Sequence, residues 1–187
     1  MCRWINKKAV DILPEDIRDI AENYTFNTHL TLNHGWRFAK TTSFPIVTMV
    51  MRGKFDYFLV QKSKYYGVNL IDQTRVNFVK EFPDYVLGTT EKGNFKSKVI
   101  IGADGVTSLV ARSLELRKKP KLGAALEGEI FPINDSANLS VYDGSLHLDF
   151  NVIPKGYGWI FPKRDHLSVG VFTTLPKVKE IKRFFSF

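Results

Sequence analysis

Short stretches of apolar residues, either continuous or alternating with polar residues, dominate the pattern along this chain. Alternation with a period of two, and continuous runs such as IVTMVM at 46–51, are typical of β-strands. Glycine, proline, asparagine and aspartate separate these stretches, as they do in turns. Asp143-Gly144 is a typical hairpin turn and is expected to join the strands predicted at 138–142 and 145–152. The predicted strands lie at 24–32, 46–51, 68–71, 74–80, 85–89, 95–101, 122–131, 138–142 and 145–152.

Apolar residues spaced by three and four predict only a few helices. The clearest spans 52–66, with Phe55, Phe58 and Leu59 on one face. A basic amphipathic helix is predicted at 177–187, where packing on the domain is our expectation and a membrane surface is the alternative. The pattern therefore favours an α+β or α/β fold, and 187 residues are enough for one domain with a core.

The stretch Lys98–Val110, KVIIGADGVTSLV, joins a β-branched apolar run to a glycine turn and a helix start. Val99–Ile101 is predicted to be a buried strand, and Thr107 or Ser108 can cap the helix that follows. Free backbone N–H groups at such a helix start favour an anion, and an acidic residue in the turn suits a sugar hydroxyl. A strand, a turn and a helix without any ligand would explain the same residues.

A second stretch, PKGYGWIFPKRDHLSVG at 154–170, predicts a β-hairpin with an aromatic face. Tyr157, Trp159 and Phe161 alternate with Gly158 and Ile160, so the three aromatic rings fall on one side of a strand. A proline and a polar turn end that strand, and apolar residues alternate again on the return. Periodicity alone does not decide whether the aromatic face is core or binding surface.

Composition and charge exclude several classes of protein. The single cysteine rules out an intramolecular disulfide framework, no apolar run is long enough to span a bilayer, and we expect a cytoplasmic protein. The net charge of +8 is scattered, without a nucleic-acid-binding motif, so nucleic acid is not an expected partner. The sequence has no nucleophile elbow, P-loop or H-E-x-x-H motif. Acidic residues at alternate positions of predicted strands are expected to face solvent; they are Glu127, Glu129, Asp143 and Asp149.

The two stretches together resemble one family. The turn at 102–105, GADG, is similar to the motif of FAD-dependent hydroxylases, and Y-G-W-I-F-P at 157–162 resembles a signature of the geranylgeranyl reductase family. The resemblance implies the central part of a FAD-binding, glutathione-reductase-like flavoprotein with an antiparallel β-sheet substrate domain. It further implies one partial flavoprotein unit over 1–187, with the substrate-domain sheet at about 25–97 and 120–175, and a strand–turn–helix of the FAD domain at 98–115.

The resemblance also implies roles for single residues. Arg52, in an R-x-x-F-D-x-x-L element, is similar to a flavin contact of the family, although a local ion pair with the aspartate at the helix start explains it too. Gly102, Asp104 and Gly105 are the other implied FAD-binding residues. The implied electron donor is NAD(P)H or a ferredoxin-type protein. Neither a metal site nor a catalytic proton donor is predicted.

The implied reaction is reduction of carbon–carbon double bonds in an isoprenoid chain. Tyr157, Trp159 and Phe161 would then contact a prenyl lipid or prenyl diphosphate, since such a chain needs an apolar site with few polar groups. The dinucleotide-binding pattern G-x-G-x-x-G is absent from the sequence, so we expect the N-terminal β-α-β unit to be missing and FAD binding by these residues alone to be weak. The alternatives are an aromatic monooxygenase and a non-enzymatic remnant that does not hold FAD.

Overall fold

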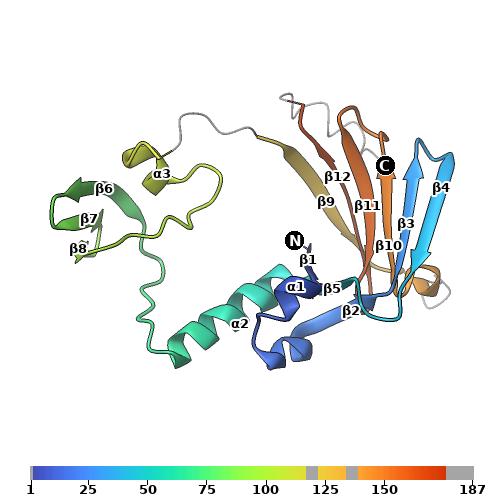
Figure 1. Ribbon diagram of the computed structural model, residues 1–187, viewed down its shortest axis with the longest axis horizontal. Helices are drawn as coiled ribbons and strands as arrows, with labels where there is room; N and C mark the ends of the chain where they lie inside the picture. The colour runs from blue at the N-terminus through green and yellow to red at the C-terminus, as the bar shows by residue number, and fades with distance from the viewer. Residues whose placement is uncertain (1, 117–121, 134–138, 176–187) are drawn as a thin grey trace. The chain divides into compact units, whose positions relative to one another are not determined.

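The computed structural model describes residues 2–116, 122–133 and 139–175 (Figure 1). The helix predicted at 177–187 lies outside these residues. The elements in chain order are β1 (Cys2–Asn6), α1 (Lys7–Val10), the 3-10 helix η1 (Glu15–Ile20), β2 (Ala21–Thr25), β3 (Asn27–Leu32), β4 (Trp36–Thr41), β5 (Val47–Met51), α2 (Arg52–Tyr65), β6 (Val76–Phe82), β7 (Tyr85–Thr90), β8 (Gly93–Ser97), α3 (Leu109–Ser113), β9 (Ala124–Ile130), the 3-10 helix η2 (Leu139–Tyr142), β10 (Ser145–Phe150), β11 (Gly156–Pro162) and β12 (Leu167–Thr173).

The described part of the chain forms two compact units. The first consists of 1–66 and 123–187, and the second consists of 67–122. The sequence had suggested one sheet running through 25–97 and 120–175, whereas the strands at 76–97 pair only with one another. They do so because β6, β7 and β8 follow each other through tight turns, so local antiparallel pairing satisfies their backbone groups.

The first unit contains two sheets. A three-stranded sheet has the order β1-β5-β2, and a six-stranded sheet has the order β4-β3-β10-β11-β12-β9 (Figure 1). All neighbours in the six-stranded sheet are antiparallel except β3 and β10, which are parallel. This largely antiparallel sheet agrees with the substrate-domain architecture expected from the sequence.

The central strand β5 is buried on both faces, which explains its continuous apolar run. Val47 and Met49 face the six-stranded sheet and pack against Phe161. Val50 points the opposite way and packs in a cluster with Ile17 and Phe55 of α2. Because successive residues of a strand point to opposite sides, one short strand supplies two hydrophobic clusters.

The second unit is small, and one cluster holds it together. Val79 and Val86 of the three-stranded sheet pack against Val110 of α3, with Ile100 at the edge of the cluster. The predicted strand through Val99–Ile101 does not form: β8 ends at Ser97, and Val99 and Ile101 are 73% and 85% exposed. The sheet of this unit is already paired through β7, and only Ile100 of the apolar run reaches its core.

Other elements also differ from the sequence prediction, among them β1, which was not predicted. No strand forms at 68–71, and Leu139–Tyr142 is a 3-10 helix, so the turn at Gly144 does not join two hairpin strands. Strand β4 was not predicted, although it pairs with β3 along its whole length. Among the described residues, no helix has both the length and the apolar character needed to cross a membrane.

Candidate functional site

The aromatic strand predicted from the sequence is β11, and its three rings lie on one face of the six-stranded sheet. The ring centroids of Tyr157 and Trp159 are 6.1 Å apart, and those of Trp159 and Phe161 are 5.8 Å apart. The rings differ in burial: Phe161 is 6% exposed and packs in the core against β5, while Tyr157 and Trp159 are half-buried. Trp159 packs against the same cluster as Phe161, yet it and Tyr157 keep part of their surface exposed.

Strand register extends the aromatic face across the whole sheet. Side chains opposite one another on paired strands share a face, so the pairs can be followed from strand to strand. The row through Tyr157 consists of Trp36, Leu32, Phe150, Tyr157, Phe172 and Ala125. The row through Trp159 consists of Phe38, Leu30, Leu148, Trp159, Gly170 and Glu127.

We call these two rows the apolar face. Large side chains at one side of the apolar face are exposed to solvent: Trp36 is 64% exposed, Leu32 46% and Phe150 40%. Trp36 and Phe38 were missed in the sequence because β4 was missed, although the alternation of W-R-F in that segment is the signal that could have found them. Large contiguous apolar patches of this kind are typical of sites that bind a ligand, a membrane or another protein.

A glycine makes room for Trp159 on this face. A Cβ atom built on Gly170 would lie 2.0 Å from an indole carbon of Trp159, so the ring lies directly over the neighbouring strand. Beyond the glycine, Glu127 is in register on the same face, and its carboxylate accepts a 2.6 Å hydrogen bond from the Ser168 hydroxyl. Glu127 is therefore half-buried and hydrogen bonded rather than fully exposed to solvent.

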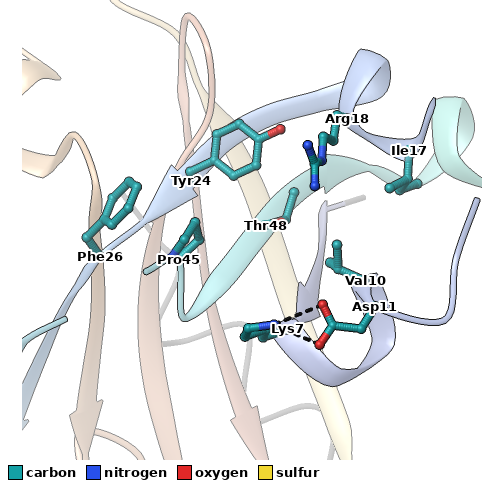
Figure 2. Close-up of a pocket in the computed structure, with 9 residues that line it drawn as sticks. All are labelled: Lys7, Val10, Asp11, Ile17, Arg18, Tyr24, Phe26, Pro45 and Thr48. Atoms are coloured by element: carbon teal, nitrogen blue, oxygen red, sulfur yellow. Dashed lines mark hydrogen bonds and ion pairs between the residues drawn. The ribbon is translucent and has the colours of Figure 1, made fainter. Parts of the chain in front are cut away.

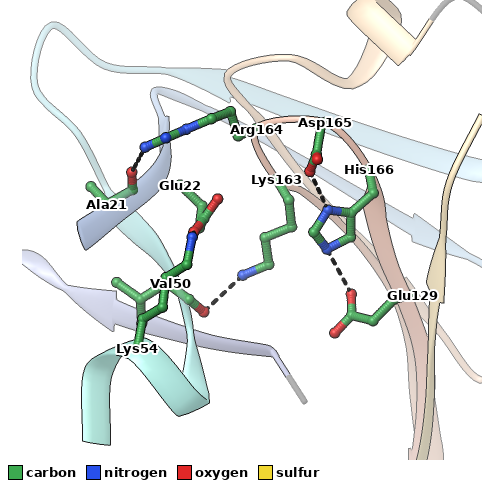
Figure 3. A network of polar contacts seen from close by, with 9 residues as sticks. All are labelled: Ala21, Glu22, Val50, Lys54, Glu129, Lys163, Arg164, Asp165 and His166. Atoms are coloured by element: carbon green, nitrogen blue, oxygen red, sulfur yellow. Dashed lines mark hydrogen bonds and ion pairs between the residues drawn. The ribbon is translucent and has the colours of Figure 1, made fainter. Parts of the chain in front are cut away.

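The turn after β11 ties the aromatic hairpin to the three-stranded sheet (Figure 3). The buried ammonium of Lys163 donates a 3.0 Å hydrogen bond to the carbonyl of Val50, near the end of β5. Arg164 donates a 2.9 Å hydrogen bond to the carbonyl of Ala21 on β2. Since β5 leads directly into α2, this turn helps to fix the place where Arg52 begins the helix.

A buried histidine follows in the same turn (Figure 3). The two ring nitrogens of His166 lie 2.6 Å from a carboxylate oxygen of Asp165 and 3.2 Å from one of Glu129. The hydrogen bond from the imidazole lowers the pKa of Asp165, because it stabilises the carboxylate. Glu129, like Glu127, was expected to face solvent, and its contact with a buried imidazole contradicts that expectation.

Arg52, the predicted flavin contact in the first unit, begins α2. Its Nε lies 2.7 Å from a carboxylate oxygen of Asp56, one turn along the helix, and both side chains are nearly half exposed. This is the local ion pair that the spacing also allowed. The two terminal nitrogens of the guanidinium have no partner among the residues that the structure describes, so they remain available to an anion.

Asp104 in the second unit caps the start of α3. Its carboxylate accepts a short hydrogen bond from the Ser108 hydroxyl, one of 2.6 Å from the Leu109 amide and one of 3.3 Å from the Val110 amide. The bond from Ser108 is the main reason that the pKa of Asp104 is lowered. A carboxylate offers about four acceptor positions, so the cap leaves some accepting capacity unused.

The glycines of the GADG turn have different roles. A Cβ atom on Gly102 would lie 2.8 Å from Val110, so this glycine lets the loop approach α3 closely. Gly105 adopts a positive φ of +85°, which favours glycine, and a Cβ there would meet nothing within 4 Å. Gly102 is therefore explained by packing, whereas Gly105 leaves open space beside the turn.

Comparisons with known proteins agree with the resemblance seen in the sequence. An uncharacterized protein from Methanosarcina barkeri is 31% identical over 140 residues, which make up 74% of this chain and 35% of that protein. The chloroplastic geranylgeranyl diphosphate reductase of Nicotiana tabacum is 33% identical over 97 residues, 52% of this chain and 20% of the enzyme. A digeranylgeranylglycerophospholipid reductase from Methanococcus vannielii is 27% identical over 66% of this chain and 32% of that enzyme. No family model matches the chain.

Solved structures show the same fold. A geranylgeranyl bacteriochlorophyll reductase-like protein from Thermoplasma acidophilum has a TM-score of 0.78 at 17% identity, covering 97% of this chain and 49% of that one. The halogenase PltM in complex with phloroglucinol and FAD has a TM-score of 0.69 at 15% identity, covering 96% and 41%.

The fold is therefore that of the FAD-binding flavoproteins. Within this class, the relatives that the chain resembles in sequence include a geranylgeranyl diphosphate reductase from a plant and a digeranylgeranylglycerophospholipid reductase from an archaeon. It spans about a third or less of the length of these relatives, at 35%, 20% and 32%.

Proposed function

We propose that this chain forms the substrate-binding sheet and part of the FAD site of a reductase that acts on carbon–carbon double bonds of an isoprenoid chain. The observation that carries the proposal is the apolar face, in which Tyr157 and Trp159 continue into exposed apolar side chains of β10, β3 and β4. The names of the homologues support an isoprenoid substrate.

The apolar face suits a prenyl chain because it offers a broad hydrophobic surface with few polar groups. Burial of apolar area contributes about 25 cal/mol per Å², so a long hydrocarbon chain gains affinity along its whole length. In this proposal Tyr157 and Trp159 contact the chain, while Phe161 supports them from the core. These rings orient the substrate and exclude water from its double bonds.

The residues available to FAD fit its chemistry. The free terminal nitrogens of Arg52 suit a phosphate oxygen, and the remaining acceptor position of Asp104 suits a hydroxyl group. Gly105 gives such a group an open approach to the turn. When bound, reduced flavin supplies the hydride for a reduction of this kind. The electron donor proposed for the flavin is NAD(P)H or a ferredoxin-type protein.

Two other functions remain as alternatives. The halogenase PltM shares the fold, but a likeness at 15% identity is evidence of fold alone. The homologues detected by sequence favour a reductase over an aromatic monooxygenase or halogenase. A remnant that binds no FAD is the other alternative, and a binding measurement separates it from the proposal.

The cofactor part of the proposal is tested by equilibrium dialysis of the 187-residue protein against FAD, which detects weak binding. We expect saturable binding that Arg52→Gln and Asp104→Ala each weaken about tenfold, as expected for loss of a hydrogen bond to a charged group. Asp84→Ala, in the exposed turn between β6 and β7, is the matched control. No saturable binding, or equal binding by all variants, would overturn the assignment of these residues.

The substrate part is tested separately by calorimetric titration with geranylgeranyl diphosphate. We expect Trp159→Ala to weaken binding about tenfold or more, since a large buried aromatic surface is lost. Trp4→Ala, on β1 and 49% exposed, is the control. If the two variants bind alike, the apolar face is not the prenyl site.

A further inference from the structure

A pocket lies in the first unit, on the side of the three-stranded sheet that faces away from the aromatic hairpin (Figure 2). Thr48 of β5 and Tyr24 of β2 are paired across the sheet and share this face, opposite to Met49, which packs towards Phe161. The volume of about 410 Å³ falls within the range of small-molecule sites. The pocket is lined by Lys7, Val10, Asp11, Ile17, Arg18, Tyr24, Phe26, Pro45 and Thr48.

Most of the lining is apolar, although the pocket is open to solvent. Tyr24 and Phe26 are each 37% exposed, while Ile17 and Thr48 are buried beneath. Val10 and Pro45 complete the apolar wall. Filling such a pocket with a hydrocarbon group removes apolar surface from water on both partners, which favours binding.

The charges around the pocket do not cancel. The ammonium of Lys7 lies 2.9 and 2.8 Å from the two carboxylate oxygens of Asp11, so these two groups neutralise each other (Figure 2). The Arg18 side chain has no hydrogen bond or ion pair within 2–116, 122–133 or 139–175. Figure 2 shows its guanidinium extending towards the other lining residues.

The acidic neighbours of Arg18 do not alter this balance inside the pocket. Asp16, on the same 3-10 helix, pairs with Lys62 of α2. Glu15 and Asp19 do not line the pocket. An apolar pocket with one free guanidinium is therefore complementary to a molecule that has an apolar body and a single anionic head.

From this combination we infer that the pocket binds an anionic amphiphile, with its hydrocarbon part against Tyr24, Phe26 and Val10 and its phosphate or carboxylate head on Arg18. This site is separate from the apolar face, which lies on the other sheet. The inference does not depend on FAD binding or on reductase activity.

The test is calorimetric titration of the 187-residue protein with four probes below their aggregation limits: decyl phosphate, decanoate, decanol and inorganic phosphate. We expect decyl phosphate or decanoate to bind in a saturable way, and decanol and inorganic phosphate to bind at least tenfold more weakly. Whichever of the two anionic probes binds more tightly identifies the head group.

Two variants complete the test. Arg18→Gln is expected to weaken binding of the anionic probe about tenfold and to leave decanol unchanged, because an exposed side chain loses only its charge. Arg37→Gln, on the exposed strand β4, is the matched control and should bind like the unchanged protein. The inference is overturned if neither anionic probe saturates, if decanol binds equally well, or if Arg18→Gln and Arg37→Gln behave alike.

Discussion

The buried ammonium of Lys163 allows a quantitative test of how the aromatic hairpin is held. Lys163 is only 4% exposed, and its ammonium donates a 3.0 Å hydrogen bond to the Val50 carbonyl. Replacement by methionine keeps the apolar stem and removes the donor. A hydrogen bond to a charged group contributes about 1.5–3 kcal/mol, and burial of the ammonium offsets part of that.

We expect Lys163→Met to lower the free energy of unfolding by about 2 kcal/mol, which corresponds to a fall in Tm of about 4–8 °C for a protein of this size. The assay is urea and thermal unfolding followed by tryptophan fluorescence. All three tryptophans, Trp4, Trp36 and Trp159, belong to the first unit, so the signal reports on the unit that contains Lys163.

Lys40→Met is the matched control for this experiment. Lys40 is exposed on the edge strand β4, so the same substitution there should change stability by no more than about 0.5 kcal/mol. If Lys163→Met also stays within that range, the hydrogen bond to Val50 contributes nothing net, and the argument that this turn anchors the hairpin to β5 is refuted.

Two further predictions concern the six-stranded sheet. Gly170→Ala should displace the Trp159 ring, lower the free energy of unfolding by about 1–3 kcal/mol and change the near-ultraviolet circular dichroism spectrum. Gly88→Ala is the control, because a Cβ atom there has open space and should change neither quantity. Equal behaviour of the two variants would contradict the close packing of Trp159 over Gly170. Burial lowers the pKa of His147, and so does the stacked His29 ring, so the folded state favours neutral His147. The contribution of neutral His147 to the free energy of unfolding is fully present above a pH of about 6.5, and it is lost as the pH falls through the pKa of His147 in the folded state. His147→Gln should therefore flatten the decline of the urea midpoint on acidification, and an unchanged slope would disprove this.

The aromatic hairpin was predictable because its determinants are local. Alternation of Tyr157, Trp159 and Phe161 sets the shared face, and Pro162 with the polar turn sets the reversal. The structure confirms both strands and the common side of the rings. The helix that begins at Arg52 was predictable for the same reason.

Features that depend on distant segments were not predictable. The parallel pairing of β3 with β10 joins strands that no local signal connects. Glu127 and Glu129 alternate like solvent-facing residues, and only the register with β12 places them on the same side as Trp159. Val99–Ile101 resembles a buried strand in composition, yet nothing in that run specifies a partner strand.

The parallel pair also has a consequence for synthesis of the protein. Asn33, just after β3, and Asn151, just after β10, are hydrogen bonded although they lie 118 residues apart in the chain. At about 5–20 residues per second, a ribosome needs roughly 6–24 s to make that interval, during which the β3–β4 hairpin has an open edge and the exposed Trp36 and Phe38. Residues 67–122, which belong to the other unit, are made in this interval. The β3–β4 hairpin therefore keeps one edge of β3 unpaired until β10 has been made and can pair with it.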